Sequence, residues 1–170
     1  MTLKDKAWRR IRVEISPDEG GAGSSIEPFR APSLAGFGIP TPYSLTGMAL
    51  SYQIAQKVHA ASDPHDPPVF VNERARDVVD LILLHNLVAR TTQPSFSNIR
   101  LAILDIFDAR ASEAKMLNRP ERLWPARVTA LPHWGDDFNR ARESAGIKLS
   151  LIDAIAQVNH WLDEIDGSAS

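Results

Sequence analysis

Apolar and polar residues alternate near the start of the chain. Between residues 8 and 16 every second position from Ile11 to Ile15 is apolar, and charged residues occupy the positions between them. A period of two predicts a half-buried strand. Because a single strand is not stable in water, we expect it to pair with the second extended stretch, Ile26 to Phe29, across the glycine- and serine-rich turn 20–25.

The segment 28–46 shows no regular period. It contains four prolines and two glycines, and the chain regains a helical pattern only after it. Proline and glycine at this density exclude a regular helix. We therefore expect a connecting segment between a β region and a helical region.

From residue 47 onward, apolar residues recur at intervals of three and four, which is typical of amphipathic helices. This pattern predicts helices over 47–61 and 73–89, a third opened by Pro94 and ending between Arg110 and Asn118, a fourth over 135–145, and a last one capped by Ser150. The irregular stretch before the fourth helix contains one short expected strand, around Arg127 to Ala130. The fold class predicted is α+β, with a short N-terminal β region over 1–46 and a mainly helical lobe over 47–170.

Composition narrows the functional classes. The 170 residues have room for one domain or two small lobes, and a net charge of −2 argues against binding nucleic acid by bulk charge alone. The absence of cysteine excludes disulfides, thiolate zinc sites and a cysteine nucleophile. No apolar run reaches about 18 residues and no signal peptide is evident, so we expect a cytoplasmic protein without a membrane partner.

Lys57 is the first candidate for chemistry. It lies between Ile54 and Val58 on the predicted helix 47–61, on the side where apolar residues should pack inward. A lysine at such a position either extends its stem along the protein surface or meets an anion. Spacing alone leaves both interpretations open.

A second candidate is the charged start of the next predicted helix. Asp77 and Asp80 are three residues apart, so a helix projects both carboxylates from one face, and Arg74 and Arg76 precede them. One interpretation is a set of surface ion pairs at a helix start, where acids are favoured by the helix dipole. The other is a carboxylate that holds a metal or a proton beside arginines that bind phosphate.

Glu14 is a third candidate, because it lies on the predicted strand 8–16 and shares one face of that strand with Arg10 and Arg12. Carboxylates on adjacent strands hold Mg²⁺ in many enzymes that transfer nucleotides. A cross-strand ion pair with a residue of a neighbouring strand explains the same glutamate. The five histidines show no i, i+4 pair that would indicate a metal site.

Two of these segments together resemble a known family. The run from Tyr52 to Ala60, which reads Tyr-Gln-Ile-Ala-Gln-Lys-Val-His-Ala, is followed by Arg-x-Arg-Asp-x-x-Asp-Leu from Arg74 to Leu81. In this order and separation they resemble the third and fourth motifs of the AbiEii/AbiGii abortive-infection nucleotidyltransferase toxins, over roughly residues 8–90. The resemblance implies a nucleotidyltransferase-like lobe joined to a helical lobe, in a toxin that moves a nucleotide from an NTP to an acceptor, tRNA in some members, and that pairs with an antitoxin protein.

The resemblance also implies residue roles. Lys57 would contact the NTP phosphates, and Asp77 would be the acid of the fourth motif. Arg74 and Arg76 would lie beside the phosphates, with Arg76 in the place of the usual lysine. Glu14 and Asp80 would help to hold Mg²⁺.

One motif of the family is not found. Its glycine-serine with a following metal-binding aspartate should precede the strand 8–16, whereas Gly23-Ser24 follows that strand and lacks the aspartate. Either the chain is the distal part of a longer enzyme or it has lost the main metal-binding acid, and we expect it to be nearly inactive by itself. The alternatives are a non-catalytic module that binds a nucleotide or a partner, and a plain helical subunit.

Overall fold

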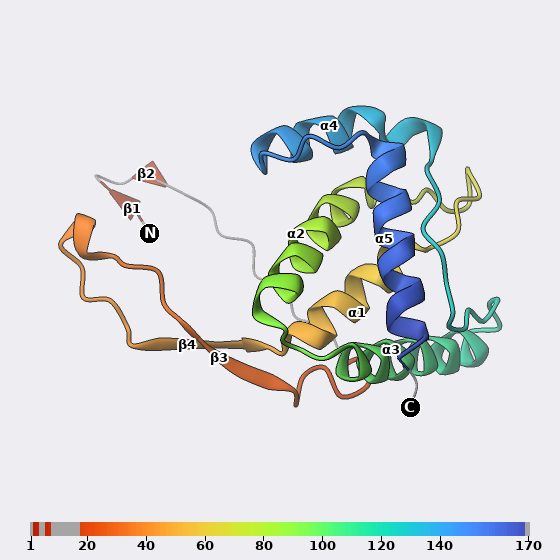
Figure 1. Cartoon of the computed structure of the whole chain (residues 1–170), viewed down its shortest axis with the longest axis horizontal. Coiled ribbons are helices and arrows are strands. Elements are labelled where there is room, and N and C mark those ends of the chain that lie inside the picture. The colour runs from red at the N-terminus through yellow and green to blue at the C-terminus, as the bar shows by residue number, and fades with distance from the viewer. Residues whose placement is uncertain (1, 4–5, 8–17, 169–170) are drawn as a thin grey trace.

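The computed structural model describes residues 2–3, 6–7 and 18–168, and these form an α+β fold with short β elements before a helical body. Figure 1 shows the helices gathered together and a long two-stranded arm extending from them. The strands are β1 (Thr2–Leu3), β2 (Lys6–Ala7), β3 (Ile26–Arg30) and β4 (Ser44–Met48), and β1 pairs with β2 and β3 with β4, both antiparallel. The fold class predicted from the sequence is confirmed.

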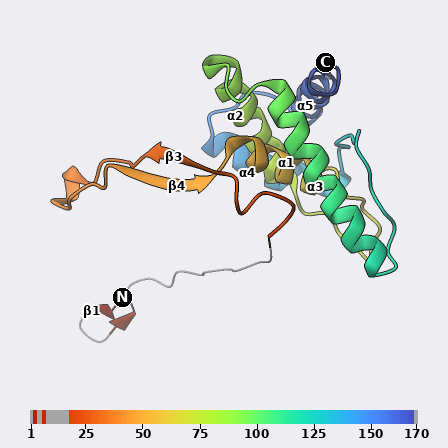
Figure 2. The same ribbon diagram turned by 90° about the horizontal axis from the view of Figure 1, so that it is seen from below.

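The β3–β4 arm departs from one expectation. The sequence correctly predicts an extended segment at β3. Its partner is β4, which lies partly in the segment expected to be a plain connection. The pairing runs from Ile26 opposite Met48 to Arg30 opposite Ser44. The partner expected for β3, residues 8–16, lies outside the described residues. All five residues of β3 are exposed and the arm extends away from the helices in both ribbon views (Figures 1 and 2). Proline is tolerated in such edge strands, so Pro28 does not prevent β3 from pairing with β4.

The helices follow the sequence prediction closely. The first two begin two or three residues later than predicted, the third begins soon after Pro94, and the last two agree with the predicted positions within a residue. Ser95 and Ser150 each cap a helix by accepting a hydrogen bond from a backbone N–H three residues on. The helices are α1 (Leu50–Ala61), α2 (Ala75–Thr91), α3 (Phe96–Met116), α4 (Gly135–Ser144) and α5 (Leu151–Asp166), with short 3₁₀ turns at Ala35–Phe37 and Pro132–Trp134.

One hydrophobic core joins all five helices. Its largest fully buried side chains include Trp134, Trp161, Phe107 and Phe138. Burial of an aromatic or aliphatic side chain of this size contributes about 1.5–3 kcal/mol each, so the helical body is held by packing. No helix among the described residues is long and apolar enough to cross a membrane.

The prediction of a strand around Arg127 to Ala130 is wrong, because the structure has no strand there. Val128 instead donates its N–H to Oδ1 of Asn159 at 3.0 Å, and Asn159 Nδ2 donates back to the Val128 carbonyl at 2.9 Å. A side-chain amide on α5 thus satisfies the backbone groups that a neighbouring strand would have satisfied.

Asn72 organises the approach to α2. It is 1% exposed, and its side chain donates to the Asp63 carbonyl at 2.8 Å and accepts from the Arg74 N–H at 2.9 Å. Its own carbonyl accepts hydrogen bonds from the ring nitrogens of His133 and Trp134, each at 2.7 Å. These bonds fix the loop from which α2 begins, and so place the first turns of α2 against α1.

Candidate functional site

Lys57 lies on α1 and reaches across to α2. The buried residues Ile54, Val58 and Ala61 hold one face of α1 in the core. Lys57 is adjacent to that face, so its stem packs at the edge of the core while its ammonium group extends beyond it. The Lys57 ammonium nitrogen Nζ lies 2.9 Å from Oδ1 of Asp77 and 2.6 Å from Oδ2 of Asp80.

The structure thus brings together three residues that the sequence analysis singled out on two separate helices. Asp77 is in the first turn of α2, where the helix dipole favours a carboxylate. Asp80 follows one turn later on the same face. The side chains of Lys57, Asp77 and Asp80 are 30%, 14% and 45% exposed, so the group lies at the surface with Asp77 as its innermost member.

The charges of this group do not cancel. One ammonium faces two carboxylates, which leaves a formal charge of −1. Burial lowers the pKa of Lys57, but the hydrogen bonds and charges of Asp80 and Asp77 raise it by more, so the Lys57 pKa lies above its ordinary value. Lys57 is thus a permanent cation at neutral pH, and the site has an unbalanced negative charge that a further cation would neutralise.

Two carboxylates fit one mode of Mg²⁺ binding. Mg²⁺ keeps several waters and is commonly bound by one or two carboxylates together with substrate phosphates. Asp77 and Asp80 supply such a pair, and the half-exposed Asp80 leaves access from solvent. Across the described residues no group of three or more histidine or acidic side chains is arranged to hold a metal by itself.

The other expected site residues do not join this group. Arg74 and Arg76 are exposed, and neither forms an ion pair with a described residue. Burial raises the pKa of the Asp63 carboxyl group, and the positive charges of Arg122 and, more weakly, of Arg74 oppose this increase. Glu14 lies outside the described residues.

A second polar cluster is not evident from the sequence. The guanidinium of Arg122 lies 2.5 Å from the Asp63 carboxylate, 2.6 Å from Nε2 of His59 and 5.7 Å from the centre of the Phe107 ring. Arg122 comes from the irregular stretch after α3, and no periodicity links it to His59, which is 63 residues away in the sequence. Its partners His59 and Asp63 lie at the end of α1, beyond Lys57.

The arrangement of this cluster suits a structural role. Burial, and then the charges of Arg122 and Arg110, lower the pKa of His59 to about 3. A neutral His59 accepts a hydrogen bond from Arg122, and Asp63 supplies the opposite charge. The cluster therefore joins the end of α1 to the segment after α3.

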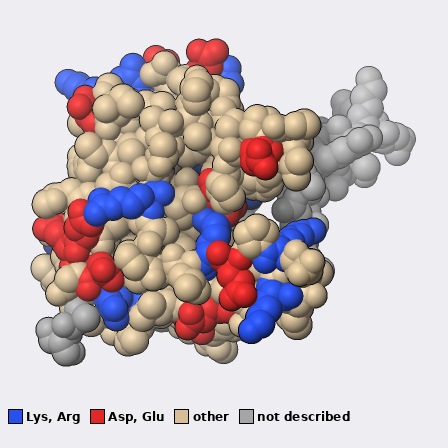
Figure 3. All heavy atoms as spheres, turned by 90° about the vertical axis from the view of Figure 1, so that its right-hand side faces the viewer, with Lys and Arg blue, Asp and Glu red and all other residues tan. Residues whose placement is uncertain are grey.

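Charged side chains of both signs are interleaved on the face of the molecule drawn in Figure 3. Blue and red groups touch one another in several places, and uncharged areas lie between these mixed clusters. Such a face has no continuous positive field to hold a nucleic-acid backbone. Any phosphate recognition by this face therefore depends on individual groups and not on a broad basic patch.

Comparison with known proteins adds no family assignment to this geometry. No protein-family model and no curated protein matches the chain.

Proposed function

We propose that the chain is a nucleotidyltransferase-like component of a toxin–antitoxin system, in which Lys57 binds the phosphates of an NTP and Asp77 and Asp80 bind the accompanying Mg²⁺. In the complete enzyme a hydroxyl of the acceptor, which is tRNA in some members of the resembling family, forms a bond to the α-phosphorus of the NTP. The bond from that phosphorus to the bridging oxygen breaks, pyrophosphate leaves, and the hydroxyl proton passes to a base.

The observation that carries this proposal is the convergence of two separate sequence motifs on one group. Lys57 belongs to the first motif and the two aspartates to the second, and Lys57 Nζ is within 2.9 Å of both carboxylates. A plain ion pair needs only one acid. A cation beside two carboxylates is also what phosphate transfer needs, since its catalysis depends on positioning and on neutralising charge at the phosphate.

The charge balance explains how an NTP would enter the site. A triphosphate alone is repelled by a site of formal charge −1, so we expect weak binding without a metal. Bound Mg²⁺ would neutralise the carboxylates and phosphate oxygens together. Asp77 and Asp80 would then release Lys57, whose ammonium group would turn from the carboxylates to a phosphate oxygen.

The experiment measures the thermal shift that NTP and Mg²⁺ together induce. We expect a shift in the wild-type protein that is lost in Lys57→Ala and retained in Lys115→Ala, an exposed lysine in the last turn of α3. Asp77→Ala should likewise lose the shift, whereas Asp136→Ala, which removes a first-turn acid of α4, should retain it. Equal shifts in Lys57→Ala and wild type would refute the proposal.

A second function, a binding module without chemistry, is favoured by one observation: both carboxylates are already hydrogen-bonded to a cation of the chain itself. The two functions are separated by incubating the chain with labelled NTP, Mg²⁺ and total tRNA. Label transfer that Asp77→Ala abolishes supports the transferase. NTP binding that depends on Lys57 but gives no labelled RNA supports the module.

A further inference from the structure

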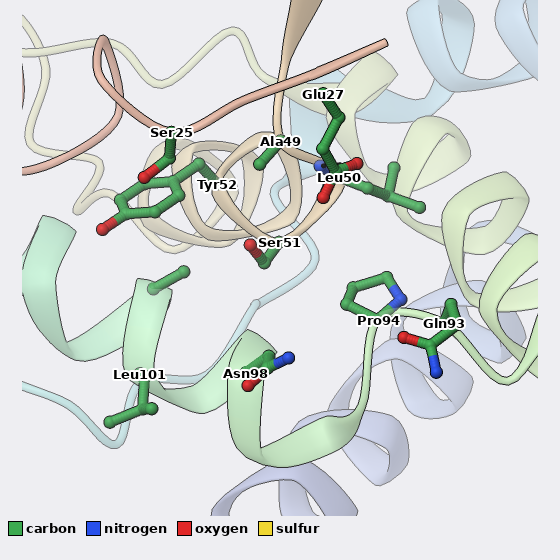
Figure 4. A pocket seen from close by; sticks show the side chains of 11 residues that line it. Ser25, Glu27, Ala49, Leu50, Ser51, Tyr52, Gln93, Pro94, Asn98 and Leu101 are labelled. Atoms are coloured by element: carbon green, nitrogen blue, oxygen red, sulfur yellow. Dashed lines mark hydrogen bonds between the residues drawn. The ribbon is translucent and has the colours of Figure 1, made fainter. Parts of the chain in front are cut away.

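A cavity of about 400 Å³ opens between the start of α1, the start of α3 and the strand β3. This volume is within the range of small-molecule sites, roughly 300–1,000 Å³. Figure 4 shows Ser51 on α1 and Asn98 on α3 on opposite walls, with Gln93 and Glu27 at the rim. The cavity thus combines a limited apolar surface with a few polar groups from separate segments.

The polar groups favour a neutral ligand over a phosphate. Ser51, Asn98 and Gln93 each have both a hydrogen-bond donor and an acceptor. Glu27 carries the cavity's only charge among the described lining residues, and it is negative. Its carboxylate is 3.4 Å from the Leu50 N–H at the start of α1, where it opposes entry of a second anion.

Apolar and aromatic side chains lie at both ends of the cavity. Leu50 and Pro94 form apolar surface near one end, and Leu101 and Tyr52 lie near the other. The hydroxyl of Tyr52 donates to Oδ2 of Asp105 at 2.8 Å, which fixes the ring in place. A planar heterocycle with donors and acceptors along its edge matches both the apolar walls and the amide groups.

One lining residue of the cavity, Leu50, shares a face of α1 with Lys57. Lys57 contacts the first turns of α2, while Leu50 shares the cavity with Gln93, which lies just beyond the end of α2, so α1 and α2 run antiparallel. Leu50 and Lys57 are seven residues apart, and therefore lie on the same face of α1 at a separation of roughly 10 Å. A nucleoside triphosphate spans a distance of this order from its base to its last phosphate.

We infer that this cavity binds the base of the NTP whose phosphates Lys57 binds, and that Glu27 favours a base with an exposed amino group. The inference rests on the proposed function. A carboxylate only accepts hydrogen bonds, so cytosine, adenine and guanine, which offer amino groups, are expected to bind more tightly than uracil. Asn98 and Ser51 hold the base from opposite sides.

The test separates base from phosphate binding. We would measure, by calorimetry with Mg²⁺, the dissociation constants of the four common NTPs and of inorganic tripolyphosphate. Ser51→Leu fills the cavity and Asn98→Ala removes its amide. The controls are Ser112→Leu and Asn86→Ala, two exposed helical positions away from the cavity, and circular dichroism verifies that each variant is folded.

We expect wild type to bind CTP, ATP or GTP about tenfold more tightly than tripolyphosphate. Ser51→Leu and Asn98→Ala should reduce this ratio towards one without changing tripolyphosphate binding, and Glu27→Gln should reduce the preference over UTP. If wild type binds NTPs and tripolyphosphate equally and Lys57→Ala binds neither, the base site is refuted. The proposed function then still stands. Absence of all binding overturns both.

Discussion

The ammonium group of Lys57 and the carboxylate of Asp80 meet at 2.6 Å across two helices, although 23 residues separate them in the chain. Asp77 lies beside them at 2.9 Å. The group therefore both joins α1 to α2 and carries a residual negative charge. These two properties give separate predictions for stability and for binding.

Removing the Lys57 side chain should destabilise the fold more than the substitution of an ordinary surface lysine. Substitution of an exposed residue usually changes the free energy of unfolding by no more than about 0.5 kcal/mol. In the structure the loss of Lys57 leaves the 14%-exposed Asp77 beside Asp80 without their shared cation. We expect Lys57→Ala to lower the free energy of unfolding by about 1 kcal/mol after allowance for solvent screening. Urea denaturation measures it, with Lys115→Ala as the unaffected control.

The two ion pairs of Lys57, with Asp77 and with Asp80, should differ in their interaction energies. A double-mutant cycle isolates the interaction energy of each pair. Asp77 is more buried than Asp80, and screening weakens exposed pairs. We therefore expect a larger coupling energy for Lys57 with Asp77 than with Asp80, despite the shorter distance to Asp80. A larger coupling for Asp80 would show that distance outweighs burial here.

Local patterns predict the helices well and single out the three members of the ion-pair group. Lys57, Asp77 and Asp80 each lie on a regular helix, and helical spacing determines which side chains share a face. Two helices in sequence with apolar faces pack side by side, so their neighbouring polar edges come together. The serine cap of α5 is likewise evident from a single residue, Ser150.

Local patterns do not predict features that depend on long-range contacts. Arg122 contacts His59 from a loop that has no hydrophobic periodicity. The side chain of Asn159 makes the hydrogen bond to Val128 that a neighbouring strand would otherwise make. The strand β4 is not evident from the sequence, because its pairing with β3 depends on a long intervening loop and not on a local apolar pattern. The cavity lined by Ser51 and Asn98 combines residues from separate elements, which no single motif identifies.

Acid should destabilise the protein through His59. Its folded-state pKa of about 3 lies below the ordinary value of 6.5, so the unfolded state binds more protons between these values and stability falls as pH falls through this range. Burial also lowers the pKa of His85, which acts in the same direction. Burial raises the pKa of Asp63, which has the opposite effect at more acidic pH.

We therefore expect wild type to lose about 1–2 kcal/mol of unfolding free energy through His59 between pH 7 and about 5. Denaturation at several pH values measures this loss. His59→Gln should flatten the profile, because glutamine does not titrate. His160→Gln, at a position 77% exposed, should leave the profile unchanged. An identical pH slope in His59→Gln would contradict the assignment.

The turn before β3 should depend on glycine at position 20. Gly20 has φ of +58°, and a Cβ there would lie 2.5 Å from Oδ2 of Asp105. That oxygen cannot move freely, because it accepts hydrogen bonds from the Gly21 N–H at 2.6 Å and the Tyr52 hydroxyl at 2.8 Å. Backbone strain and the clash together predict that Gly20→Ala destabilises the protein by about 1–3 kcal/mol.

Thermal and urea unfolding of Gly20→Ala measure this loss, and Gly36→Ala is the control, since no atom beyond its own neighbours in the chain lies within 4 Å of its added Cβ. We expect the control to remain within about 0.5 kcal/mol of wild type. In Asp105→Ala the obstructing carboxylate is gone, so a further Gly20→Ala substitution should cost only the backbone strain. If Gly20→Ala costs the same in both backgrounds, Asp105 does not restrict this turn.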